Sequence, residues 1–82
     1  MIPDDFFGPA IQRSRQKRGI QIKEACRRAG LFPFYWRWIE AGKVELRLAT
    51  FAKMAKGLET TPYQLMREIE FQAALMLHSG KS

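Results

Sequence analysis

The 82-residue chain has few of the residue types that carry catalysis, metal binding or disulfide bonding. It has one cysteine, Cys26, one histidine, His78, and only two aspartates, Asp4 and Asp5, which are adjacent. A lone cysteine cannot form an internal disulfide, and no Cys/His spacing suits zinc. Because catalysis needs a convergent set of reactive groups, we expect no enzymatic activity, no cofactor and no metal. We expect Cys26 to be a core residue and His78 to be inert.

Long apolar runs are missing as well. The longest mostly apolar stretch near the C-terminus, residues 73–77, is far shorter than the roughly 20 residues that span a bilayer. The N-terminus has no secretory signal pattern. We therefore expect a soluble, cytoplasmic protein, and at this length one domain over residues 1–82 with a modest core.

Basic residues outnumber acidic ones, 14 to 8, which gives a formal net charge of +6. The net charge is +4 over residues 1–30, +3 over residues 31–57 and −1 over residues 58–82. The positive charge thus belongs to the first two thirds of the chain. Such a balance suits nucleic acid, an anionic membrane face or an acidic protein partner, and cannot by itself choose between them.

Helical periodicity dominates the sequence, and no run alternates with period two for long enough to predict a strand. Gly8 and Pro9 are suited to the N-cap and first position of a helix that ends before Gly19. Thr61 and Gln64 have capping-box spacing around Pro62. The sequence predicts helices over about 9–18, 21–29, 33–41, 47–58 and 62–77.

The inner faces of these helices follow from the same spacing. The expected buried residues are Ala25, Cys26, Ala29, Trp36, Ile39, Leu48, Phe51, Ala52, Ala55 and Leu58. On the last helix, Leu65, Ile69, Ala73 and Met76 form one stripe, which packs on the domain or forms a dimer contact.

The second and third expected helices, joined across Gly30 and Leu31, have helix-turn-helix spacing. At these residues the sequence resembles the Cro/C1 or XRE-like helix-turn-helix family, in one register from about Phe7 to Leu65. The matching residues are Arg15, Arg18-Gly19-Ile20, Cys26, Gly30-Leu31, Tyr35-Trp36, Ile39-Glu40-Ala41-Gly42-Lys43, Leu48 and Lys53-Met54-Ala55-Lys56-Gly57-Leu58.

The resemblance implies an all-α fold, a compact five-helix Cro/C1-type domain with an extended C-terminal helix. Its core is expected over 7–66, the helix extension over 67–78 and a frayed tail over 79–82. The resemblance also implies that Arg15 and Glu40 tie the first helix to the third, and a surface bridge worth ~0–1 kcal/mol is the alternative.

The sequence departs from the family at the positions that read DNA. Family members read bases with polar side chains from the start of the second helix and the exposed face of the third. The matching positions here are Ile22, Phe32, Pro33, Phe34 and Trp38. None is a conventional hydrogen-bonding reader of base edges, and the chain has no asparagine.

Four basic residues, Lys23, Arg37, Lys43 and Arg47, are the candidates for contacts to a nucleic-acid backbone, although Glu45 would repel phosphate. Such contacts give salt-sensitive affinity that is independent of base sequence. DNA binding is therefore expected to be weak or non-specific.

The leading hypothesis is that the former DNA face binds a protein. Ile22, Phe32, Pro33, Phe34 and Trp38 would form an exposed apolar patch with Arg37 on its rim. The expected partner is a transcription factor that the chain blocks, similar to the antiactivators of integrative and conjugative elements, with the chain a monomer or weak homodimer.

Four alternatives stay open. The chain could be a sequence-specific DNA-binding repressor of the XRE family, or its aromatic residues could stack on single-stranded bases. The third helix could rotate its aromatic residues into the core. Residues 2–7 could fold over the patch, although Phe6 or Phe7 is expected to pack under the first helix.

Overall fold

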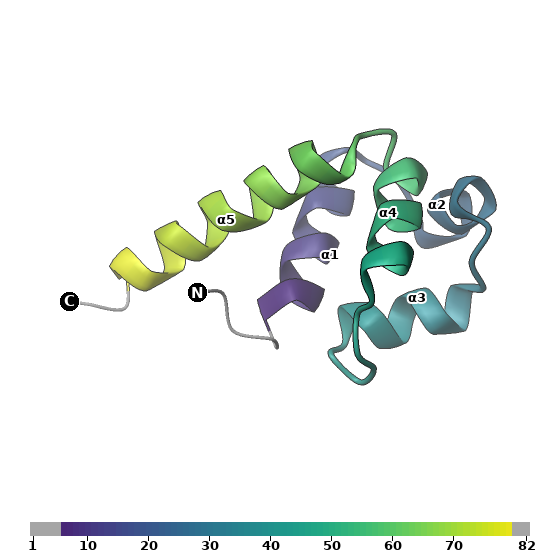
Figure 1. The fold of residues 1–82 in the computed structure, drawn as a ribbon, viewed down its shortest axis with the longest axis horizontal. Helices are drawn as coiled ribbons and strands as arrows, with labels where there is room; N and C mark the ends of the chain where they lie inside the picture. Colours follow the sequence, from purple (N-terminus) through teal and green to yellow (C-terminus); the bar gives the residue numbers. More distant parts are fainter. Residues whose placement is uncertain (1–5, 80–82) are drawn as a thin grey trace.

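The computed structural model describes residues 6–79, with side chains through Met76. The described chain is helical without strands, as the sequence predicts (Figure 1). The helices are α1 (Phe7–Lys17), α2 (Ile22–Ala29), α3 (Pro33–Glu40), α4 (Leu48–Gly57) and α5 (Pro62–Ser79). In Figure 1, α2, α3 and α4 gather at one end, and α5 runs along α1 toward the other. None of the described helices has the length and apolar character that a bilayer crossing requires.

All five helices contribute to one hydrophobic core. Its members are Phe6, Ala10, Ile11, Ala25, Cys26, Ala29, Trp36, Ile39, Phe51, Met54, Ala55, Leu58, Leu65, Ile69 and Ala73. Gly57 lets α4 approach α2 closely: a Cβ added at this residue would lie 2.4 Å from the carbonyl oxygen of Ala25. Trp36, which is fully buried, supplies volume that alanines on α2 do not.

The first helix begins earlier than predicted. Phe6 rather than Gly8 is at the N-cap, and Gly8 lies inside α1. A Cβ on Gly8 would lie 2.5 Å from the carbonyl oxygens of Ile39 and Glu40. Gly8 therefore allows the start of α1 to pack against the end of α3, and the predicted N-cap at Gly8 is wrong.

The other helix ends lie within two residues of the expected ones. Gly30 and Gly42 both have a φ of 73°, the left-handed conformation that ends α2 and α3. The backbone N–H of Gln64 donates to Oγ1 of Thr61 at 3.1 Å, which confirms the predicted cap of α5. Helix α5 continues to Ser79, two residues beyond the expected end, and 80–82 lie outside the described residues.

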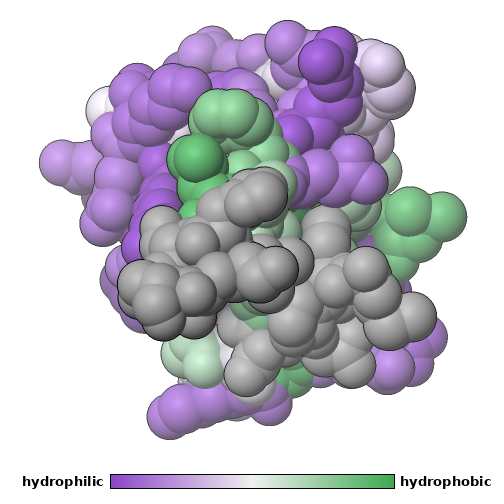
Figure 2. All heavy atoms as spheres, turned by 90° about the vertical axis from the view of Figure 1, so that its left-hand side faces the viewer, coloured by the Kyte–Doolittle hydropathy of each residue, from purple (hydrophilic) through white to green (hydrophobic). Residues whose placement is uncertain are grey.

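Three expected core positions are exposed. Leu48 is 81% exposed and Ala52 is also on the surface, whereas Met54 takes an unpredicted core position. Met76 continues the buried stripe of α5 in sequence, but it is 51% exposed. Figure 2 shows the face toward which α5 runs, where apolar surface lies among hydrophilic residues.

A polar network joins α1 to α3. The guanidinium of Arg15 donates to both carboxylate oxygens of Glu40, from Nε to Oε2 at 2.7 Å and from Nη2 to Oε1 at 3.1 Å. The indole Nε1 of Trp36 donates to the same Oε2 at 2.7 Å. Arg15 also donates to the carbonyl of Ile20 at 3.0 Å. The pair is largely buried, so it is more than a solvent-exposed bridge.

Candidate interaction surface

The turn between α2 and α3 fixes the start of α3. The backbone N–H groups of Gly30 and Leu31 donate to the carbonyl of Cys26, at 2.8 and 3.2 Å. Phe32 occupies the N-cap of α3 with an extended backbone, and Pro33 takes the first helical position. The carbonyl of Phe32 accepts the first hydrogen bonds of α3. The turn thereby leaves the Phe32 side chain 71% exposed.

Helix α3 has an aromatic residue on each face. Trp36 and Ile39 point into the core, whereas Phe34 is 51% and Trp38 46% exposed. The exposure of Phe34 and Trp38 excludes the alternative in which the third helix rotates these aromatic residues into the core. The arrangement follows from helical geometry, because positions four apart share a face.

The three exposed rings pack on one another, and we call Phe32, Phe34 and Trp38 the aromatic cluster. The rings of Phe32 and Phe34 are stacked, with centroids 5.7 Å apart and an interplanar angle of 21°. The rings of Phe34 and Trp38 meet edge to face, with centroids 5.1 Å apart and an angle of 75°. These contacts give the cluster the geometry of ordinary aromatic packing and make it a continuous apolar surface.

The other two residues of the predicted patch are less exposed. Ile22 is partly buried and packs against the core, because it lies on the inner side of α2. Pro33 is partly buried at the start of α3. The patch is thus narrower than predicted and centred on the aromatic cluster. Phe6 is buried in the core and Phe7 packs against it, while residues 2–5 lie outside the described residues.

A shallow hollow adjoins Pro33, between the start of α2 and the turn, with a volume of about 420 Å³. Its lining residues are Gln21, Lys23, Glu24, Cys26, Arg27, Leu31 and Pro33. Sequence reasoning missed Leu31 and Arg27 here, because the hollow depends on the angle between α2 and α3. Burial raises the pKa of the Cys26 thiol, which makes it a poor nucleophile.

The carboxylates of α2 and α3 are already engaged. Glu24 forms ion pairs with Arg27 and, at 3.0 Å, with Arg28. The hydrogen bond from Arg27 lowers the pKa of Glu24. Glu40 is held by Arg15, as described above. These carboxylates are not available to neutralise the remaining basic side chains of the two helices.

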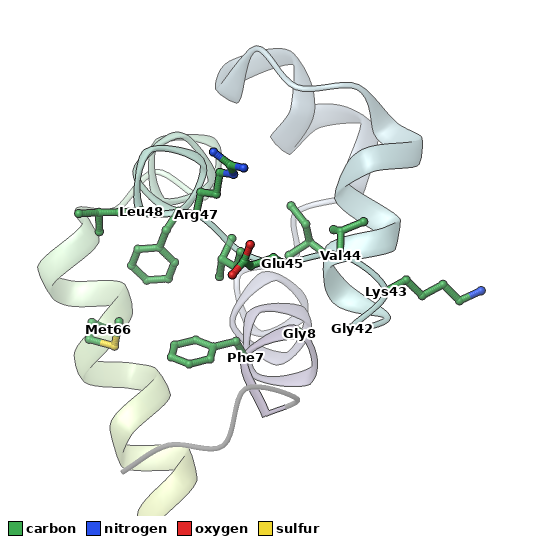
Figure 3. Close-up of a pocket in the computed structure, with 12 residues that line it drawn as sticks. Phe7, Gly8, Gly42, Lys43, Val44, Glu45, Arg47, Leu48 and Met66 are labelled. Carbon is green, nitrogen blue, oxygen red and sulfur yellow. The ribbon is translucent and has the colours of Figure 1, made fainter.

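All four candidates for contacts to a nucleic-acid backbone are exposed: Lys23, Arg37, Lys43 and Arg47. Among the described residues, none has a carboxylate within 4.0 Å. Figure 3 shows the side chains of Lys43 and Arg47 pointing in different directions from the α3–α4 loop, with Glu45 between them. Lys43 and Arg47 therefore do not converge on one phosphate-binding group.

The same loop borders a larger hollow of about 650 Å³. Phe7 of α1, Met66 of α5 and Leu48 of α4 contribute to its apolar wall (Figure 3). Sequence reasoning missed this hollow because its lining comes from α1, α3, the α3–α4 loop, α4 and α5. Among the described residues, no group of His, Cys, Asp and Glu is arranged to hold a metal ion.

Comparison with known proteins identifies the family. The model of the family described as "Helix-turn-helix domain" matches residues 7–68, so the chain belongs to that family. Its class is that of the small helix-turn-helix transcriptional regulators of the Cro/C1 or XRE-like type, as the sequence indicates. A search of the curated proteins finds no match.

Solved structures share the fold. The restriction-modification controller protein C.AhdI from Aeromonas hydrophila is 25% identical, with a TM-score of 0.67 over 73% of this chain and 91% of that chain. The clp gene regulator ClgR from Corynebacterium glutamicum is 20% identical, with a TM-score of 0.78 over 95% and 87%. A point mutant of the controller protein C.Esp1396I is 18% identical, with a TM-score of 0.75 over 83% and 91%.

Proposed function

We propose that this regulator acts by binding another protein through the aromatic cluster, in the manner of an antiactivator that blocks a transcription factor. The observation that carries the proposal is the exposure of Phe32, Phe34 and Trp38 where helix-turn-helix proteins present readers of base edges. Arg37 and the partly buried Pro33 and Ile22 border the cluster.

The chemistry of the cluster supports a protein partner. Phenylalanine rings cannot form hydrogen bonds to bases, and Trp38 offers a single N–H donor. Exposed tryptophan and phenylalanine are typical anchors of protein interfaces, and Arg37 would form part of a polar rim. Covering ~400 Å² of apolar surface contributes on the order of 10 kcal/mol before the costs of association are subtracted.

Sequence-specific DNA binding is the second candidate function. It is favoured by family membership and by the exposed basic residues Lys23, Arg37, Lys43 and Arg47. Those side chains are suited to phosphate, and phosphate contacts add affinity without base specificity. On the exposed face of α3, Arg37 is the one side chain that can contact a base bidentately, and Phe34 and Trp38 beside it are apolar or carry a single donor, so we rank this function second.

Capture of the partner with matched variants tests the proposal. Tagged parent protein, Phe34→Ala and Trp38→Ala would be expressed in the native host, and co-purifying proteins quantified by mass spectrometry. We expect one transcription factor to be captured by the parent and lost, by at least about tenfold, with both variants. Tyr63→Ala, which removes an exposed ring on α5, is the control and should retain it.

DNA titration separates the two functions. The parent is titrated with labelled genomic fragments at low salt and at about 150 mM salt, where exposed charge pairs are screened. We expect weak, sequence-independent binding that salt abolishes. Specific binding that survives the higher salt would favour the repressor, and equal capture by the parent and both variants would exclude the aromatic cluster as the interface.

A further inference from the structure

The basic side chains around the aromatic cluster are distributed on more than one side of it. Lys23 lines the hollow that adjoins Pro33, at the N-terminal end of α3. Lys43 lies at the opposite end, where its backbone N–H donates to the carbonyl of Trp38 at 2.9 Å. Arg37 is exposed on α3 itself, next to Trp38 in the chain. Basic residues thus lie near both ends of α3 and on α3 itself.

This positive charge is not neutralised within the described part of the chain. Lys23, Arg37 and Lys43 have no carboxylate within 4.0 Å there. Glu24 is paired with arginines of α2, Glu40 is held by Arg15, and the exposed Glu45 lies beyond that distance. An apolar surface bordered by unpaired cations is complementary to a ligand that carries both apolar groups and anions.

Nucleic acid also carries anions, but the three rings of the cluster are packed on one another. Stacking requires an open ring face. Phe32 is stacked with Phe34, and Trp38 meets Phe34 edge to face. The cluster therefore presents a packed apolar surface rather than separate stacking platforms, which favours aliphatic or aromatic side chains as its partners.

We propose that the occupant of the cluster is an acidic amphipathic segment of a polypeptide. Its apolar side chains, three or four residues apart, pack on Phe32, Phe34 and Trp38. Aspartates or glutamates beside them pair with Lys23, Arg37 and Lys43. The exposed face of α3 from Phe34 to Trp38 is about one helical turn long, so two such anchors cover it and its N-cap. This inference rests on the proposed function and specifies the chemistry of its partner.

Selection from a random-peptide phage library on the immobilised full chain tests the inference. We expect enriched peptides to combine leucine, isoleucine or aromatic anchors with an excess of aspartate and glutamate. Binding of the enriched synthetic peptides is then measured by fluorescence anisotropy. Enrichment of neutral or basic peptides, or of none over a bare-resin control, would overturn the inference.

Two sets of variants separate the failure of this inference from that of the proposed function. Phe34→Ala and Trp38→Ala should each weaken peptide binding at least about tenfold, and if neither does, the interface itself is wrong. The triple variant Lys23→Gln, Arg37→Gln, Lys43→Gln should weaken it about tenfold at low salt and less at high salt. If only the aromatic variants matter, the partner is apolar but not acidic.

A matched control removes the same charge elsewhere. Arg13, Lys53 and Lys56 are exposed on α1 and α4, and the variant with all three changed to glutamine has the same net charge as the first triple variant. It should bind the peptides within about twofold of the parent. If both triple variants weaken peptide binding equally, the loss of net charge alone explains the effect, which would contradict the inference. A single-stranded oligonucleotide that binds more tightly than the peptides would also overturn it.

Discussion

Trp36 and Trp38 are two residues apart on α3, yet Trp36 is fully buried and Trp38 is 46% exposed. Two residues are about 200° apart around an α-helix, so neighbouring tryptophans of this spacing face opposite sides. The indole of Trp36 donates to Glu40 inside the protein, whereas Trp38 packs against Phe34 outside it. The buried ring therefore belongs to the core, and the exposed ring is accessible to the proposed partner.

Alanine substitution should separate those roles. Trp36→Ala removes a fully buried ring and should lower the free energy of unfolding by about 3–5 kcal/mol. Trp38→Ala removes an exposed ring and should lower it by less than about 1 kcal/mol. Urea unfolding followed by far-UV circular dichroism measures both. Similar losses for the two variants would contradict the assignment of one ring to each face.

The Glu40 carboxylate is expected to be needed for stability. Glu40→Ala leaves the largely buried Arg15 guanidinium and the Trp36 N–H without their acceptor, so we expect a loss of about 3 kcal/mol in unfolding free energy. Glu40→Gln retains an acceptor oxygen and should cost less. The exposed Glu45→Ala is the control, and chemical denaturation of all three gives the comparison. No difference between the Glu40 and Glu45 variants would show that the network contributes nothing.

A second ion pair gives the fold a pH dependence. Arg18 donates to both carboxylate oxygens of Glu68, at 2.8 and 2.6 Å, and these hydrogen bonds lower the pKa of Glu68 below its ordinary value of 4.5. Because the pKa is lower in the folded state, the pair stabilises the protein above the unfolded-state value. That contribution is lost as the pH falls below about 4.5 through the folded-state pKa.

Glu68→Gln should remove this dependence. Since the pair is partly accessible to solvent, we expect it to contribute about 1 kcal/mol or less at neutral pH. The variant should be less stable at pH 7 and should lose less stability in acid than the parent. Glu70→Gln removes the same charge from an exposed residue of α5 and is the control. Parallel stability curves for the parent and Glu68→Gln between pH 3 and 7 would contradict the prediction.

The α2–α4 contact should be intolerant of a methyl group at Gly57. Helix propensity alone predicts that Gly57→Ala stabilises α4 by about 1 kcal/mol. The added Cβ would lie 2.4 Å from the backbone oxygen of Ala25, which is not a flexible side chain. We therefore expect destabilisation by about 1–3 kcal/mol, measured by thermal or urea unfolding. Ala52→Gly, at an exposed position on the same helix, measures the propensity effect without the contact.

Local signals in the sequence predicted most of the fold. The Thr61 cap, the glycines at 30 and 42 and the spacing of Trp36 and Ile39 each depend on the nearest turn of the chain. The role of Gly8 depends on a tertiary contact, which the sequence does not show. A glycine that allows two backbones to meet cannot be distinguished, from sequence alone, from a glycine at a helix boundary. The predicted burial of Leu48 is wrong for a similar reason. Periodicity places a residue on one face of a helix but does not show how far the neighbouring helices extend.

The candidate surface was predictable in part. Once Trp36 and Ile39 were assigned to the core, helix geometry required Phe34 and Trp38 to be outside. The partial burial of Ile22 and the hollow beside Pro33 depend on the angle between α2 and α3, which spacing along one helix does not determine. The pairing of Glu24 with Arg27, which leaves Lys23 without a carboxylate within 4.0 Å in the described structure, likewise required three-dimensional coordinates.

Photo-crosslinking from position 34 in living cells tests most directly which kind of molecule contacts α3. A photoreactive phenylalanine analogue replaces Phe34, cells of the native host are irradiated, and the purified adducts are treated with protease or nuclease. We predict one adduct that protease removes and nuclease leaves intact, with a transcription factor as the attached chain. An adduct that nuclease removes would show that this face contacts nucleic acid and would contradict the proposed protein partner.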